Sequence, residues 1–552
     1  MFLRKVHMLF LRRFTAVSFL FFIHFIAWGS ENLIVKTDVG SVRGYVRYGN
    51  IEFLGIPYAK SPAGILRWTP PAPIEPWSGV KNAQNFGPAC PQQARYGITE
   101  ASEQEDCLSL NISIPKQKTI QSMKSLPVIV WLHGGAFVGG SSNLYRLDKL
   151  TREGRIVVVS VNYRLGTLGF MPHNSFEKDN NGGYGLLDQR EALRWVQRNI
   201  QKFGGDPNNV TIAGESAGAG SVCMHLASAD KVRGLFHKAI VMSAACFQPM
   251  RTVDEAANNV GAKVTSDVGC ANSSDTLDCL RRVPVADLLN AQGKATQSDT
   301  LAFAPVVGNQ VVPRQATESV RSGQFVKVPI LMGGTRKELL IYVAYAEQGG
   351  KRITPENYSE YLNAIYGLTA EERARKVPEQ VAQNYPLVGK ETAPVTLGQA
   401  VTDFTPMIGI NSCLLLHTGQ ELAKSQNLYM FEFADDDALV SGVSIPPKPE
   451  LSFKLGAVHS SELNYLFPRM SNNSKINAPA LPVASQGLAT TMVAYWTHFA
   501  RHGVPKAPQS AAWPLYSGPD KVMQLKPKQI KTFDASMLHK CDFWKRMYPE
   551  RL

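Results

Sequence analysis

The stretch Gly214-Glu215-Ser216-Ala217-Gly218 decides the fold of this chain. It is a G-x-S-x-G pattern between a strand-like run, residues 209–213, and a helical run, residues 217–228, that starts with small residues. A strand, a tight turn and a helix in this order form a nucleophile elbow, where strained backbone angles hold the serine hydroxyl clear of the sheet. Gly214 and Gly218 fit the pattern, because a side chain at either place would meet the strand or the helix. The stretch therefore predicts Ser216 as a nucleophile.

Strand-like and helical runs alternate on both sides of the elbow. Short apolar runs predict further buried strands, at residues 128–132, 156–161, 238–243, 328–333 and 428–433. Residues 185–200 carry apolar side chains at helical spacing, which predicts a helix. The alternation indicates an α/β fold with a central, mostly parallel twisted sheet and helices on both faces. Residues 250–325 and 345–425 are expected to be helical insertions between strands.

The N-terminus carries a targeting signal. Four basic residues precede an apolar stretch at residues 14–28, and the small residues around Gly29 suit cleavage before Ser30. An uncleaved anchor is the alternative, which the shortness of the apolar stretch disfavours. We therefore expect residues 1–29 to be a signal peptide and residues 30–552 to form one catalytic domain. With no other long apolar run, the mature protein is expected to be soluble, without a stable membrane span, and secreted or extracytoplasmic (extracellular, secretory lumen or periplasm).

The composition excludes some classes of partner. The 552 residues are 44% hydrophobic, enough for a large core, and the formal net charge is +13. The chain has no Lys/Arg-rich run and no nucleic-acid motif, so we attribute the charge to a solvated surface and expect no nucleic-acid partner. The oligomeric state stays open.

Eight cysteines behind a secretory leader favour disulfides over metal ligands, and no C-x-x-C occurs. Cys90 and Cys107 bracket one short loop, and Cys270 and Cys279 bracket another. Cys223 lies inside the helix after the elbow and is expected to be a buried thiol, with Cys246 a candidate for the same state. Spacing alone leaves the pairing open, and no metal or other cofactor is expected.

Five N-x-S/T sequons make the chain a candidate glycoprotein. Asn111 and Asn209 open apparent core strands and are poor glycan sites. Better placed, in polar loops, are Asn272, Asn357 and Asn472.

A serine nucleophile needs three kinds of support. A base must take its proton, an acid must orient that base, and preset donors must bind the oxyanion. His133-Gly134-Gly135-Ala136-Phe137 follows a predicted strand. We expect the oxyanion donors to be the backbone N–H groups of Gly134, Gly135 and Ala217, the alternative being an ordinary glycine turn.

Chain order locates the acid and the base, because in this fold class they follow the serine in the order Asp or Glu, then His. Glu338 follows the strand that ends near Gly333 and is the predicted acid. Its rival, the acidic run at residues 435–437, is more typical of a solvated turn. His459 lies in a loop shortly after the strand at residues 428–433 and is the predicted base. His417 and His498 fit apolar or helical runs and are expected to be packed; the runner-up, His502, is expected to be structural.

In these motifs the chain resembles the type-B carboxylesterases of the cholinesterase/carboxylesterase family, which have the α/β-hydrolase fold. The resemblance runs from about Val35 to Pro549. Its motifs are Phe53-Leu-Gly-Ile-Pro-Tyr-Ala, Glu105-Asp-Cys-Leu-Ser-Leu-Asn, His133-Gly-Gly-Ala-Phe, Asn162-Tyr-Arg-Leu-Gly, Phe203-Gly-Gly-Asp-Pro-Asn-Asn-Val-Thr and the elbow. It implies a secreted serine esterase that acts on small-molecule esters.

The resemblance also implies roles for particular residues. It implies a Ser216–Glu338–His459 triad, in agreement with the search by chain order, and places Glu215 as a supporting glutamate beside the nucleophile. The disulfides that it implies are Cys90–Cys107, Cys270–Cys279 and Cys413–Cys541. The buried ion pairs that it implies are Arg67–Glu105 and Arg164–Asp188.

The chain departs from the family pattern at three positions. Leu339 replaces the glycine that usually follows the acid, Ser460 replaces the glycine that usually follows the histidine, and Gly183 stands where an asparagine is common. None of these changes removes a reactive atom.

The loop between Cys90 and Cys107 bears on the substrate. Residues 91–106 contain no tryptophan, and Tyr96 is their only aromatic residue. Since cholinesterases hold the quaternary ammonium over a tryptophan in this loop, a choline-ester specialist is disfavoured. The loop is also short for a lipase lid, which disfavours a lipid-ester specialist.

Leu301 and Phe303 match the acyl-pocket segment of the family, and the leucine would leave room for the acyl chain. We expect broad or short-to-medium-chain ester substrates, with amide hydrolysis and acyl transfer left open. A non-catalytic adhesion or binding ectodomain of the same fold is the alternative. It is disfavoured because the chain keeps Ser216, Glu338 and His459 and ends without an apolar tail.

Overall fold

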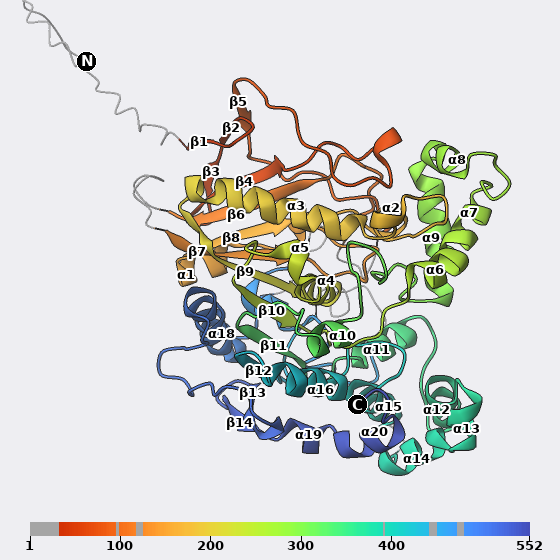
Figure 1. The fold of residues 1–552 in the computed structure, drawn as a ribbon. Coiled ribbons are helices and arrows are strands. Elements are labelled where there is room, and N and C mark those ends of the chain that lie inside the picture. The colour runs from red at the N-terminus through yellow and green to blue at the C-terminus, as the bar shows by residue number, and fades with distance from the viewer. Residues whose placement is uncertain (1–32, 95–98, 117–124, 390–391, 441–449, 472–479) are drawn as a thin grey trace, which may run out of the picture.

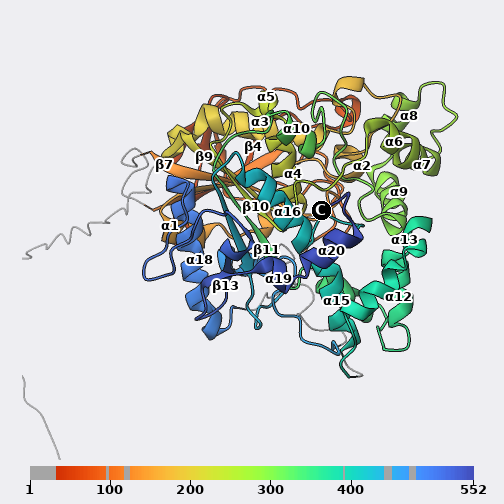
Figure 2. The ribbon, with the colours of Figure 1, turned by 60° about the horizontal axis from the view of Figure 1, so that its bottom comes forward.

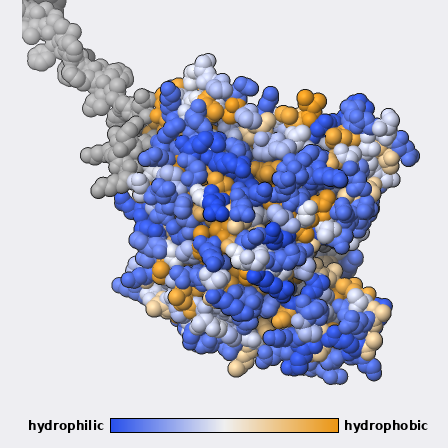
Figure 3. Space-filling model, in the orientation of Figure 1, coloured by the Kyte–Doolittle hydropathy of each residue, from blue (hydrophilic) through white to orange (hydrophobic). Residues whose placement is uncertain are grey.

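The computed structural model describes residues 33–94, 99–116, 125–389, 392–440, 450–471 and 480–552. The predicted leader lies outside these ranges, as do Tyr96 and Asn472. Within them, no helix combines the length and the apolar character needed to cross a membrane. Hydrophilic residues cover most of the face shown in Figure 3, with small apolar areas scattered among them.

An 11-stranded mixed sheet forms the centre of the molecule (Figure 1). The strands, in their spatial order, are β14 (Lys531–Phe533), β13 (Val522–Leu525), β12 (Leu428–Phe433), β11 (Ile330–Thr335), β10 (Lys238–Met242), β9 (Gly205–Glu215), β7 (Leu126–Leu132), β8 (Val157–Val161), β6 (Ser109–Pro115), β4 (Asn50–Pro57) and β3 (Tyr45–Arg47). From β13 to β8 every neighbouring pair is parallel, and the outer pairs are antiparallel. A separate 3-stranded sheet consists of β1 (Ile34–Lys36), β2 (Ser41–Arg43) and β5 (Val80–Asn82).

Both faces of the main sheet are buried. Along β7, Val128, Val130 and Leu132 belong to one core cluster, whereas Ile129 and Trp131 belong to another. Successive side chains of a strand point to opposite faces, so a continuously apolar strand needs cover on both.

Different helices supply that cover (Figures 1 and 2). Helices α3 (Tyr184–Asn199) and α4 (Ala217–Leu226) contribute to the first cluster, and α1 (Asp148–Gly154) and α18 (Val483–His502) to the second. The predicted parallel sheet with helices on both faces is confirmed.

Two groups of helices are inserted between strands, as the sequence predicted. The first follows β10 and consists of α6 (Val253–Ala256), α7 (Ala262–Asp267), α8 (Thr276–Arg282), α9 (Val285–Ser298) and α10 (Ala316–Arg321). The second lies between β11 and β12 and consists of α11 (Leu340–Gln348), α12 (Tyr358–Tyr366), α13 (Ala370–Ala374), α14 (Val377–Asn384), α15 (Ala393–Asp403) and α16 (Ser412–Ala423). Figure 1 shows α6–α9 and α12–α14 at one side of the molecule, beyond the ends of the strands.

The three disulfides that the resemblance implied are present, as are the ion pairs Arg67–Glu105 and Arg164–Asp188. The expectation for Cys223 and Cys246 is wrong, because they form a fourth disulfide with Cα atoms 5.0 Å apart. The reason lies in the sheet order: β9 and β10 are neighbours, so the helix after β9 lies beside the segment after β10. The position of Cys223 in a buried helix could not by itself predict that Cys246 lies beside it.

Candidate active site

The nucleophile elbow has the backbone that its sequence predicts. Strand β9 ends at Glu215, α4 begins at Ala217, and Ser216 between them has φ 56° and ψ −124°. A Cβ atom on Gly214 would lie 2.4 Å from the backbone of Gly218, and one on Gly218 would lie 2.1 Å from the carbonyl oxygen of Leu132. Only glycine allows strand, turn and helix to approach this closely.

Three polar side chains meet at the elbow. His459 Nε2 lies 2.9 Å from Ser216 Oγ, and His459 Nδ1 lies 2.8 Å from Glu338 Oε2. The backbone N–H of His459 also donates to the carbonyl oxygen of Glu338, at 3.1 Å. The exposed fractions of Glu338 and His459 are only 3% and 7%, so water competes little for these bonds. The structure thus brings together the serine, acid and histidine that chain order selected.

A fourth side chain, Ser243, fixes the acid. Its hydroxyl donates to Glu338 Oε1 at 2.6 Å, and the backbone N–H of Thr335 donates to the same oxygen at 2.7 Å. Sequence reasoning missed Ser243. The available signal was its position directly after β10, since parallel strands bring their carboxyl ends to one edge of the sheet.

The other histidines considered as bases lie elsewhere. His417 is on α16, with its ring against Phe247, and the rings of His498 and His502 contact each other on α18. His539, which sequence reasoning did not single out, is fully buried.

His539 forms a buried charged cluster of its own. Its Nδ1 lies 2.6 Å from Asp403 Oδ1, and its Nε2 lies 2.5 Å from Glu432 Oε2. Burial lowers the pKa of His539, but the charges of Glu432 and Asp403 outweigh it and raise the pKa to about 10.

Carboxylates control the charge of His459. Burial lowers its pKa, but the charge of Glu215 and the hydrogen bond and charge of Glu338 outweigh burial and raise the pKa to about 9. Glu215 Oε1 lies 3.2 Å from His459 Nε2, and burial raises the pKa of Glu215 against the opposing effect of His459.

Glu462 is fully buried, and neither of its carboxyl oxygens has a hydrogen-bond partner among the described residues. Burial, together with the charges of Glu215 and Glu338, raises its pKa well above the ordinary value. Sequence reasoning missed this residue too.

The departures from the family pattern have local explanations. Leu339 has φ −94°, an ordinary angle that does not require glycine. Ser460 has φ 66°, in the left-handed region, and its hydroxyl donates to Glu215 Oε1 at 2.5 Å. The serine thus gains a hydrogen bond at a position where glycine would be free of strain. Gly183 precedes α3, and a Cβ atom there would lie 2.8 Å from the Val311 side chain.

The glycine-rich loop after β7 faces the elbow. Gly135, Ala136 and Phe137 have φ angles of 119°, 55° and 62°, an unusual run of left-handed backbone. A Cβ atom on Gly134 would lie 2.8 Å from Glu215 Oε2 and 3.1 Å from Ser216 Cβ. Glycine therefore lets the backbone of this loop come directly against the nucleophile.

His133 anchors the same loop. Its ring stacks on Tyr163 at 4.3 Å between centroids, and the Tyr163 hydroxyl donates to the carbonyl oxygen of His133 at 2.5 Å. Burial lowers the pKa of His133 to about 4, so the ring is neutral at pH 7.

A cavity of about 90 Å³ opens at Ser216. Gly134, Gly135 and His459 line it. Ala217 lies beside it as the first residue of α4, where a backbone N–H has no partner within the helix. This arrangement can bind a carbonyl group and hold negative charge on its oxygen. Among the described residues, no group of three or more His, Cys, Asp or Glu side chains is arranged to hold a metal ion.

A larger, mostly apolar cavity of about 460 Å³ lies next to the first, and Tyr342 lines both. Leu301 and Leu339 are among its lining residues. Phe303, the other residue of the expected acyl pocket, has no exposed surface and is part of the core. Of the two residues, Leu301 is therefore the one at the cavity wall.

Comparison with known proteins gives consistent results. The model of the carboxylesterase family matches residues 31–544. Para-nitrobenzyl esterase of Bacillus subtilis is 32% identical, over 88% of this chain and 92% of that protein. Acetylcholinesterase of Bungarus fasciatus is 30% identical, over 94% of this chain and 87% of that protein. A solved structure of PNB esterase has a TM-score of 0.73 at 30% identity, covering 92% of this chain and 99% of that one.

Proposed function

This chain belongs to the carboxylesterase family, and we propose that it hydrolyses carboxylic esters through an acyl-enzyme formed on Ser216. It is a carboxylic ester hydrolase, as its named esterase relatives are. The observation that carries the assignment of residues is the unbroken contact from Ser216 Oγ through the His459 ring to Glu338, at 2.9 and 2.8 Å.

The first half of the reaction forms the acyl-enzyme. His459 Nε2 takes the proton of Ser216 as Oγ attacks the ester carbonyl carbon. Glu338 holds the ring through Nδ1 and stabilises its positive charge. The tetrahedral intermediate collapses, the bond to the alcohol oxygen breaks, and His459 returns the proton to the leaving alcohol.

In the second half, water replaces the alcohol. His459 takes a proton from the water, which attacks the acyl carbon and releases the carboxylic acid, and Ser216 regains its proton. The backbone N–H groups of Gly134, Gly135 and Ala217 are the proposed donors to the oxyanion in both halves. Removing one such donor typically costs about 10²–10³ in rate. The sequence of steps requires no metal or other cofactor.

The two cavities suggest the size of the ester. The cavity at Ser216 is small, about 90 Å³, whereas the neighbouring one is about 460 Å³ with a mostly apolar wall that includes Leu301. We assign the larger cavity, which shares Tyr342 with the cavity at Ser216, to the acyl chain. This assignment favours short-to-medium acyl chains over acetyl alone.

We further propose that the protein is secreted, with residues 1–29 as a cleaved signal peptide and residues 30–552 as one catalytic domain. All eight cysteines form disulfides, a state typical of oxidising compartments. N-glycosylation is expected at Asn272, which is exposed, rather than at Asn111, which is buried and donates to Ser142 and Ser160.

The test is hydrolysis of p-nitrophenyl esters from acetyl to dodecanoyl by the wild type and by Ser216→Ala, with acetylthiocholine for comparison. Serine-dependent turnover that peaks at short or medium chains supports the proposal. A peak at dodecanoyl or a preference for acetylthiocholine would overturn the substrate assignment. No serine-dependent turnover in a folded protein would favour a non-catalytic binding role.

A further inference from the structure

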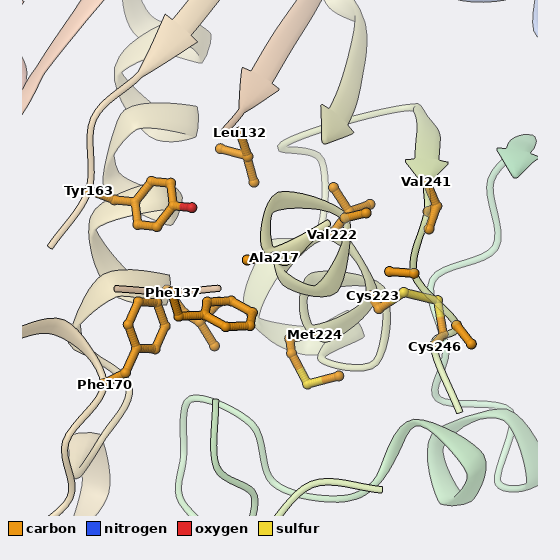
Figure 4. Packing of buried hydrophobic residues seen from close by; sticks show 14 of the residues in the cluster. Leu132, Phe137, Tyr163, Phe170, Ala217, Val222, Cys223, Met224, Val241 and Cys246 are labelled. Atoms are coloured by element: carbon orange, nitrogen blue, oxygen red, sulfur yellow. A yellow bond between two sulfur atoms is a disulfide. The ribbon is translucent and has the colours of Figure 1, made fainter. Parts of the chain in front are cut away.

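The fourth disulfide lies close behind the proposed catalytic residues. Cys223 is on α4, the helix that begins directly after Ser216, and Cys246 is three residues beyond Ser243. Both cysteines are 1% exposed. Figure 4 shows the sulfur–sulfur bond crossing from α4 to the segment after β10, near Val241. The bridge thus joins the helix of the nucleophile to the segment that carries the donor to Glu338.

Hydrogen bonds between the strand ends connect the same two places. The backbone N–H of Ser216 donates to the carbonyl oxygen of Met242 at 2.9 Å, and that of Ser243 donates to Gly333 at 2.7 Å. The Ser243 hydroxyl then reaches Glu338 Oε1 at 2.6 Å. The ends of β9, β10 and β11 are therefore linked in series, with Ser243 between the nucleophile and the acid.

Ser243 is held in an unfavourable conformation. Its φ of 57° lies in the left-handed region, which is unfavourable for a non-glycine residue. Residues 243–248 form neither helix nor strand, and the backbone N–H groups of Ser243 and Ala245 donate to the carbonyl oxygens of Gly333 and Gly409. Such a conformation persists only where the surroundings enforce it. The disulfide is the covalent constraint at this segment.

We propose that the Cys223–Cys246 disulfide is a positioning element for ester hydrolysis. It fixes Ser243 relative to α4, and so it keeps the side chains of Glu338 and Ser216 in place against the two nitrogens of the His459 ring. The inference rests on the proposed roles of Ser216, Glu338 and His459. A positioning role differs from a structural one because it acts on turnover at a temperature where the protein stays folded. Displacing a catalytic group by about 1 Å can cost about 10² in rate.

The chain offers a matched control bridge. Cys270–Cys279 joins the segment after α7 to α8 in the first insertion, at the right-hand edge of the molecule in Figure 1, whereas α4 lies near the centre. Its removal also opens a covalent loop but touches none of the strand ends at the site. We expect it to lower the Tm and leave kcat unchanged.

The experiment uses two variants without the bridge, Cys223→Ala/Cys246→Ala and Cys223→Val/Cys246→Ala, the second of which fills more of the space left by the sulfur atoms. The control variant is Cys270→Ala/Cys279→Ala. Each is assayed for kcat, KM and Tm on a p-nitrophenyl ester that the wild type hydrolyses. The proposal expects kcat to fall about tenfold with little change in KM in the first two variants only. Wild-type kcat with a lowered Tm would overturn the positioning role.

Two further measurements make the test specific. If the bridge acts through Ser243, adding Ser243→Ala to a bridge-free variant costs less than the product of the separate losses. If the losses in kcat from the two changes multiply fully, the bridge does not act through Ser243, and this part of the proposal is overturned.

Should neither variant fold, the wild-type protein can be reduced with TCEP in urea below its unfolding transition, with bridge opening followed by alkylation and mass spectrometry. Loss of kcat that follows opening of Cys223–Cys246 supports the proposal, and full activity with that bridge open contradicts it. A serine-independent wild-type activity would instead overturn the proposed function itself, so the two failures are distinguishable.

Discussion

Glu215 Oε1 lies 3.2 Å from His459 Nε2, the same ring nitrogen that faces Ser216 Oγ at 2.9 Å. One nitrogen therefore has both a carboxylate and the nucleophile as neighbours. The carboxylate favours the protonated ring, and this is one cause of the pKa of about 9. A carboxylate at this nitrogen favours the charged form of the ring, so in the proposed mechanism Glu215 would stabilise the imidazolium that forms when Ser216 attacks.

The first prediction concerns Glu215→Gln, which removes that charge and keeps the size of the side chain. His459 acts as a base only when neutral, so activity is present above its pKa and lost below it. Without the neighbouring charge the pKa falls, and the acid limb of the kcat/KM profile is expected to move to lower pH. A limb that stays in place or moves to higher pH would contradict the assigned charge interaction.

A second prediction separates strain from hydrogen bonding at Ser460. Ser460→Gly removes the hydroxyl that donates to Glu215 but relieves a φ of 66°, whereas Ser460→Ala removes the hydroxyl and keeps the strain. We expect the glycine variant to be more stable than the alanine variant by about 1 kcal/mol in urea unfolding. Equal stabilities would show that the left-handed backbone at this position is not strained.

For Ser243→Ala, we expect lower kcat with little change in KM, because the hydroxyl touches Glu338 and not the ester. A hydrogen bond to a charged group is worth about 1.5–3 kcal/mol, equivalent to roughly 10- to 100-fold in rate. Steady-state kinetics on a p-nitrophenyl ester measures the change. Wild-type kcat in this variant would mean that Thr335 and the fold hold the acid without it.

His539→Gln tests the buried cluster with Asp403 and Glu432. Removing one partner of a buried ion pair costs about 3–5 kcal/mol, and we expect a loss of that order in the free energy of unfolding. The folded pKa of His539 is raised to about 10, so its stabilisation is complete below its unfolded pKa of about 6.5 and is lost as pH rises through 10.

The variant should accordingly differ most from the wild type at pH 6 and least above pH 10, in urea unfolding at several pH values. His498→Gln, which changes a histidine on α18 outside the cluster, serves as the control. A pH-independent difference between wild type and His539→Gln would contradict the charged state of this residue.

The sequence predicted the elements and the candidate site residues that depend on local pattern and chain order. Ser216 follows from its motif, and Glu338 and His459 follow from their positions after later strands. Ser243 and the Cys223–Cys246 bridge were missed because their placement depends on which strands are neighbours in space. Glu462 and His539 were missed because their surroundings depend on tertiary burial. The edge strands β3 and β14, of 3 residues each, also escaped prediction, as did β4, which has 8 residues and pairs with β3.

The central claim is that an acyl group is carried on Ser216. The most direct measurement is to mix the protein with p-nitrophenyl butyrate, quench in acid within the first turnovers, digest, and locate the acyl group by mass spectrometry. The account predicts a butyryl group on the peptide that contains Ser216, with neither adduct nor turnover in folded Ser216→Ala. A butyryl group on another residue that turns over, or undiminished hydrolysis by Ser216→Ala, would contradict it.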